Sequence, residues 1–175
     1  MRKLGVVILK VSAFDIVVSV LSALACLGAV LHLPVWSLFI GWAWYLALGS
    51  KKEVICEAGL TCILSALLAL SAVVLSDVFQ PFCGSLGASM LSVLLIIFLL
   101  MMLLKHPQVK HPLVAFNSFS CIFAGYYLQA FPVQPEYFWN LFYAFVWITG
   151  TNILGLFVGW LSIALTNLHK TVIEE

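Results

Sequence analysis

The sequence has few charged residues. They make up 9% of its 175 positions, against about 25% in an average soluble domain. Apolar residues make up 64%. A water-soluble fold of this length could not bury that much apolar surface, so we expect the excess to face lipid. The formal net charge is +1 and no run of like charge exceeds two residues, which argues against nucleic acid as a partner.

The motifs that mark common enzymes are also missing. There is no nucleotide-binding loop, no H-E-x-x-H and no G-x-S-x-G. The five cysteines form no C-x-x-C pair, the four histidines do not pair on a helix face, and no long polar segment offers room for a catalytic domain. We therefore expect no enzymatic activity, no metal and no cofactor. Isolated cysteines in apolar runs are typical small packing residues.

Six apolar runs predict an all-α fold. We expect a single domain over residues 1–175, a polytopic membrane bundle with spans at about 11–31, 34–48, 54–75, 88–104, 112–131 and 137–165. The second run is shorter than the roughly 20 residues that a full crossing needs. The last run is longer, so we expect it to tilt, protrude or break, with the break at Thr149-Gly150-Thr151-Asn152.

The basic residues predict the orientation. With six spans all of them fall on one side of the membrane, and the intervening loops contain no lysine or arginine. The positive-inside rule then places both termini in the cytoplasm. Five or seven spans would divide the basic residues, which are Arg2, Lys3, Lys10, Lys51, Lys52, Lys105, Lys110 and Lys170.

The two halves of the chain are weakly alike. Each has a long first span, a second span that begins at proline and carries aromatic residues, and a third span with small and hydroxyl residues. Because three spans is an odd number, the halves would have opposite orientations. This pattern is typical of the inverted repeats of transporters and some channels.

A nonapeptide in the second span suggests a family. It has the pattern F-x-G-x-x-x-Y-x-A, and the last span carries glycines at Gly150, Gly155 and Gly159. In these features the chain resembles the small bacterial inner-membrane family that includes enterobacterial YcdZ, a domain of unknown function. The resemblance implies a multi-span bundle in the bacterial inner (cytoplasmic) membrane and assigns no catalytic residue. The nonapeptide is Phe39-Ile40-Gly41-Trp42-Ala43-Trp44-Tyr45-Leu46-Ala47.

Two carboxylates lie about one helical turn inside predicted spans. Ionisable residues in a span are costly and are by default functional candidates. Asp15 and Glu57 are therefore candidates for charged gates at the cytoplasmic mouth. The alternative is that both are interfacial residues that pair with nearby lysines.

Two polar clusters lie deeper in the predicted membrane. Thr149, Thr151 and Asn152 interrupt the last span, and the fifth span contributes Asn117 and Ser120 with Ser118 between them. Such groups either bind a solute where a helix unwinds or clamp neighbouring helices by hydrogen bonds. Under a pseudo-symmetric fold the two clusters would face one cavity.

The second and last spans carry further candidates. Trp42 and Tyr45 are three residues apart and share a helix face, so they are candidates for an aromatic-lined pathway as well as for an interfacial belt. Gly155 and Gly159 form a small-xxx-small face that favours close helix packing.

Together these features predict a small channel or transporter for an uncharged or weakly polar solute. Six short spans enclose little volume, so we expect a homo-oligomer in the lipid bilayer. The alternative is a non-transporting membrane subunit or regulator that binds another membrane protein through its helix faces.

Overall fold

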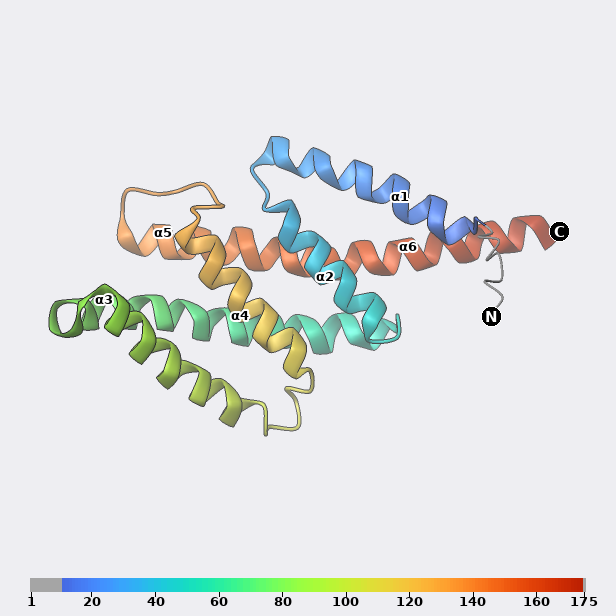
Figure 1. The fold of residues 1–175 in the computed structure, drawn as a ribbon. Helices are drawn as coiled ribbons and strands as arrows, with labels where there is room; N and C mark the ends of the chain where they lie inside the picture. The colour runs from blue at the N-terminus through green and yellow to red at the C-terminus, as the bar shows by residue number, and fades with distance from the viewer. Residues whose placement is uncertain (1–10, 175) are drawn as a thin grey trace, which may run out of the picture.

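The computed structural model describes residues 11–174, with side chains described as far as Leu168. The described residues form helices joined by short turns and contain no strand, which confirms the all-α prediction (Figure 1). Three helical segments among them are long and apolar enough to cross a membrane: Ala13–Leu31, Lys52–Leu103 and Tyr137–Leu168. Many large apolar side chains are exposed, as expected for a surface that faces lipid.

The chain begins with a helix on the outside of the bundle. Helix α1 (Ala13–Ala25) continues as the 3₁₀ segment η1 (Cys26–Leu31), which ends at His32 in a left-handed conformation. Ser12 and Asp15 form a capping box at its start. The helix packs along α6, and none of its residues is buried.

Helix α2 (Val35–Ala47) is as short as its apolar run predicts. It begins directly after Pro34, which suits a helix start because proline lacks the backbone N–H. At about 1.5 Å per residue it reaches only about 20 Å. It lies across α6, where it makes the most extensive helix–helix contact of the fold.

Helix α3 (Lys52–Leu103) doubles back on itself at Gly84 (Figure 1). We call residues 52–83 its first leg and residues 85–103 its second leg. Gly84 has φ 71° and ψ 170°, a conformation that glycine adopts without steric cost. The hydroxyls of Ser76 and Ser89 lie 3.2 Å apart and tie the legs together.

The predicted spans 54–75 and 88–104 left residues 76–87 between two helices, and the structure corrects this. The structure continues the helix through Asp77, Gln80 and Pro81, and the reversal needs only the one residue with positive φ. The side chains that suggested a turn instead lie on the exposed surface of the helix near the reversal.

The second half continues with α4 (Pro112–Tyr127), which crosses the first leg of α3. A long last helix follows, made of α5 (Tyr137–Ala144), the π-helical segment η2 (Phe145–Thr149) and α6 (Gly150–Glu174). In the figure α5–α6 runs in the opposite direction to the first leg of α3.

The predicted break at residues 149–152 is wrong, because the backbone remains helical there. Gly150 has φ −59° and ψ −43°, and α6 proceeds without interruption. The irregularity is the π turn Phe145–Thr149, which widens the helix and ends at the first residue of the predicted break. A π turn keeps most backbone groups bonded, whereas an unwound segment inside a membrane leaves them without partners.

Candidate functional site

Asn152 lies where four helices meet. Its side chain is on α6 and is 1% exposed. Helix α2 touches its backbone, since a Cβ atom added at Gly41 would lie 1.8 Å from the carbonyl oxygen of Asn152. The other sides are closed by Cys62 on α3 and by Ser118 and Cys121 on α4. Residues from both halves of the chain thus converge on one buried amide.

The bonds that the Asn152 side chain makes are weak. Its Nδ2 donates to the sulfur of Cys121 at 3.5 Å, and the Cys62 thiol donates to its Oδ1 at 3.5 Å. The hydroxyl of Ser118 donates in turn to the Cys62 sulfur at 3.1 Å. An amide side chain offers two donors and an acceptor oxygen with two lone pairs, while thiols are poor donors and acceptors. The polar capacity of this buried amide is therefore only partly used.

A small void lies between these side chains, and no water-sized molecule fits in it. Its lining includes the four side chains just described, together with Ile148 and Thr149. Thr149 is 5% exposed, and its buried hydroxyl has no hydrogen-bond partner. A buried polar atom without a partner costs about 1–3 kcal/mol. The interior beside Asn152 is thus closed, and the polar side chains around it are incompletely bonded.

The π-helical turn adjoins this void. The hydroxyl of Thr151 donates to the carbonyl of Trp147 at 2.6 Å, and the hydroxyl of Ser37 on α2 donates to the carbonyl of Ile148 at 2.9 Å. Side chains thus bond two consecutive carbonyls of the turn. Such turns occur frequently at functional sites, because they shift the register of the side chains that follow.

Trp42 and Tyr45 lie away from this void, in the contact between α2 and α6. Trp42 donates its Nε1–H to the hydroxyl of Ser162 at 3.3 Å, and Tyr45 donates to the carbonyl of Ser50 at 2.8 Å. Both rings pack on Gly159, where an added Cβ would lie 2.8 Å from the Cβ of Tyr45. The two aromatics fill a helix–helix contact and line no open path in this structure.

Gly155 lies one turn before Gly159 on the same face of α6. A Cβ atom added there would lie 2.0 Å from the carbonyl oxygen of Leu38. The backbones of α2 and α6 therefore approach each other directly, and the glycine face predicted for close packing lies against α2.

Asn117 and Ser120 point away from Asn152. Each bonds its own helix, Asn117 to the carbonyl of Leu113 at 3.0 Å and Ser120 to that of Phe116 at 2.9 Å. Ser118, between them, is the residue of this cluster that reaches the interior. The helical period indicates this, since Val114, Ala115, Cys121, Ile122 and Gly125 share its buried face.

The two charged candidates lie at helix starts. Asp15 is exposed and caps α1, where its carboxylate accepts from the backbone and the hydroxyl of Ser12 at 2.7 Å. Glu57 pairs with Lys110 at 2.7 Å and contacts the imidazole of His111 at 3.2 Å. Its partners come from the segment that precedes α4, rather than from Lys51 or Lys52.

Cys62 and Cys121 are the site residues that the sequence did not single out. Both thiols are buried and contact Asn152, whereas Cys26, Cys56 and Cys83 are exposed. A signal was available, because Cys62 shares a helix face with the small residues Ser65, Ala66 and Ala69. That pattern predicts close helix packing, but it does not predict that Cys62 contacts the Asn152 amide on α6.

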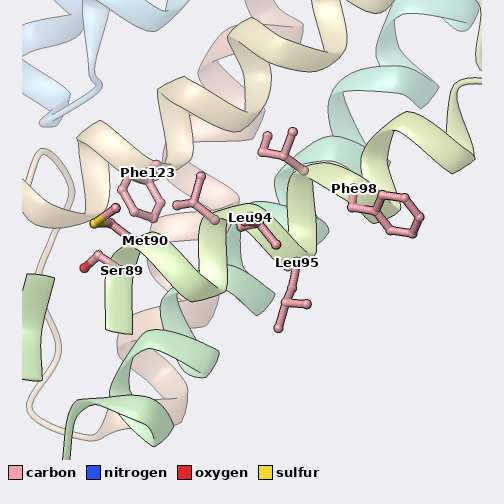
Figure 2. A pocket seen from close by; sticks show the side chains of 8 residues that line it. Ser89, Met90, Leu94, Leu95, Phe98 and Phe123 are labelled. Carbon is pink, nitrogen blue, oxygen red and sulfur yellow. The ribbon is translucent and has the colours of Figure 1, made fainter. Parts of the chain in front are cut away.

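A larger hollow on the surface is apolar. It has a volume of about 1000 Å³ and lies between the second leg of α3 and α4, where Figure 2 shows Phe123 beside Met90 and Ser89. Its lining offers almost only hydrocarbon, which suits contact with lipid. The lining residues are Ser89, Met90, Val93, Leu94, Leu95, Ile97, Phe98 and Phe123.

Comparison with known proteins gives one result. A family model described as "Protein of unknown function (DUF1097)" matches residues 15–167. The match covers all the residues of the Asn152 site. No curated protein and no solved structure matches the chain. Because the family model covers most of the sequence, the chain belongs to the DUF1097 family, an uncharacterised domain family with helices suited to a membrane.

Proposed function

We propose that this protein is a small membrane channel or transporter for an uncharged or weakly polar solute, and that the solute interacts with the amide of Asn152. The observation that carries the proposal is that this buried amide bonds only two sulfur atoms, each at 3.5 Å. A structural clamp between membrane helices gains most from strong partners. An amide with weak partners can exchange them for a solute at little cost.

The packing of the helices supports two inverted halves and six spans. In the first half α1 and α2 pack on α6 of the second half. In the second half the second leg of α3 and α4 pack on the first leg of α3. The last span of each half is thus covered by the first two spans of the other half. Inverted-repeat transporters bind their substrates at such a junction between the halves.

We also propose that all basic loops face the cytoplasm of a bacterial cell, with the chain in the inner membrane and both termini inside. The ion pair of Glu57 with Lys110 supports one common side, because it joins the start of α3 to the segment before α4. The bacterial inner membrane is the location that the sequence resemblance implies, and we propose it on that ground alone. The proposal includes a homo-oligomer and assigns no catalysis to the chain.

The closed interior represents one state of the proposed pathway. No water-sized molecule fits beside Asn152, so the helices around it must move for a solute to enter. On the α3 and α4 side of Asn152 the side chains are small and the contacts to sulfur are weak. Because these contacts separate most easily, we propose that the pathway opens on this side.

Flux measurements on reconstituted protein test the proposal. Proteoliposomes are challenged with a panel of small neutral solutes and weak acids, and swelling is followed by stopped-flow light scattering. We expect selective, protein-dependent swelling that Asn152→Leu abolishes. Asn117→Leu is the matched control, since it removes an amide that points away from the site. Equal flux through both variants would show that Asn152 is not on the pathway.

A second function has one observation in its favour. A non-transporting subunit or regulator needs no opening, and the void beside Asn152 admits no water-sized molecule. This reading predicts no flux for any solute from folded protein and a membrane-protein partner that co-purifies at fixed stoichiometry.

A further inference from the structure

Two buried hydroxyls on facing helices have no hydrogen-bond partner. They belong to Ser65 on α3, which is 0% exposed, and to Thr149 at the end of the π turn, which is 5% exposed. A buried hydroxyl without a partner loses the bonds it would make to water, so its presence calls for an explanation.

Neighbouring hydroxyls show that a partner was within reach. Thr61 and Ser71 on α3 donate to the carbonyls of Glu57 and Leu67, four residues earlier in each case, at 2.9 Å. Thr151 does the same on α6, at 2.6 Å. Ser65 and Thr149 do not use this common local bond. Their hydroxyls remain available to a third group.

The helix directions put the two hydroxyls at the same level of the bundle. Ser65 follows Cys62 by three residues, and Thr149 precedes Asn152 by three residues. Because the first leg of α3 and α5–α6 run in opposite directions, both lie one turn from the Cys62–Asn152 contact, on the side of the Gly84 reversal. Thr149 also lines the void beside Asn152, and none of the lining side chains carries a charge.

From this placement we infer that Ser65 and Thr149 form a hydrogen-bonding subsite for a small neutral solute that carries both donor and acceptor groups, such as a polyol or an amide. This inference rests on the proposed function and deepens it. The two hydroxyls supply the strong bonds that the Asn152 site lacks, and they are satisfied only when the solute is present.

The subsite predicts opposite changes in stability and flux. Ser65→Ala and Thr149→Val each remove an unsatisfied hydroxyl, so the unfolding temperature of the purified protein should stay the same or rise. Flux of glycerol or urea, whichever wild type conducts, should fall at least fivefold in each variant. Thr61→Val is the control, because it removes a hydroxyl that is already bonded within its helix. It should leave the flux unchanged.

The failures of this inference and of the proposed function are distinguishable. If wild type conducts and the Ser65→Ala/Thr149→Val double variant conducts equally, the subsite is absent while the proposed function stands. A loss of flux accompanied by a lower unfolding temperature would overturn the subsite as well, since it indicates a structural role. If folded wild type conducts none of the solutes, the proposed function fails and the subsite fails with it.

Discussion

The two sides of α6 are built differently. On one side its backbone touches that of α2 through Gly41 and Gly155. Ser37 on α2 donates to the carbonyl of Ile148 at 2.9 Å, and the ring N–H of Trp42 donates to the hydroxyl of Ser162 at 3.3 Å. On the other side Asn152 faces α3 and α4 across weak sulfur contacts, a small void and a hydroxyl without a partner.

The difference distinguishes a tightly packed structural contact, between α2 and α6, from a candidate binding site on the α3/α4 side. Close backbone contact between small residues is how membrane helices gain stability without a hydrophobic driving force. Polar groups that are buried and left partly unbonded reduce stability, so each of them calls for an explanation. We therefore assign the α2 side to holding the fold together and the α3/α4 side to the solute.

The largest expected effect is on the α2 side. Gly155→Val places side-chain atoms where the backbone of Leu38 already lies, so we expect a loss of more than about 3 kcal/mol of stability. Thermal unfolding of purified protein followed by tryptophan fluorescence measures it. Gly150→Ala is the control, because nothing lies within 4 Å of a Cβ added there. A well-folded Gly155→Val protein would mean that the close contact between α2 and α6 does not hold the fold together.

A smaller loss is expected from the hydroxyl that joins α2 to the π turn. Ser37→Ala removes the bond to the carbonyl of Ile148 and leaves that carbonyl buried, which should cost about 1 kcal/mol. The unfolding temperature should fall accordingly. Ser120→Ala, which removes a hydroxyl bonded only to its own helix, should change it less. Equal effects would contradict the assigned role of the Ser37 bond.

On the α3/α4 side we expect stability to change little. Asn152→Leu replaces a weakly bonded amide by an apolar side chain of similar size, so the change should stay within about 1 kcal/mol. Flux, if present, should be lost. A large loss of stability would indicate that Asn152 is a structural clamp, which would remove the contrast between the two sides.

The smallest effect concerns the surface ion pair of Glu57. Glu57→Gln removes the negative charge that pairs with the half-exposed Lys110, and exposed ion pairs contribute little to stability. We expect a slight fall in the unfolding temperature at low salt that disappears at high salt, because salt screens the pair in wild type as well. A large, salt-independent fall in the unfolding temperature would mean that this ion pair helps to hold the fold together.

The sequence predicts the helices well and the contacts between them poorly. Periodicity and length suffice for the short α2 and for the glycine face at Gly155 and Gly159, since these depend on local pattern. The reversal in α3 was expected over many residues, yet Gly84 alone makes it.

The π turn and the sulfur contacts of Asn152 could not be predicted from the sequence. A π turn is stabilised by partners such as Ser37, which is 111 residues away from Ile148. The cysteines contact the amide only because α3, α4 and α6 cross at one point. Long-range crossings of this kind leave no mark on the local hydrophobic pattern.

Thiol labelling of the buried cysteines tests the central claim most directly. In a protein whose exposed Cys26, Cys56 and Cys83 are replaced by serine, Cys62 and Cys121 report opening of the α3/α4 side. Ser162→Cys, introduced after Cys62 and Cys121 are also replaced, reports the α2 side from an equally buried position. We predict that a small membrane-permeant thiol reagent labels Cys62 and Cys121 in proteoliposomes well below the unfolding temperature and leaves the cysteine at position 162 unmodified. Equal protection of all three cysteines until the protein unfolds would contradict the account.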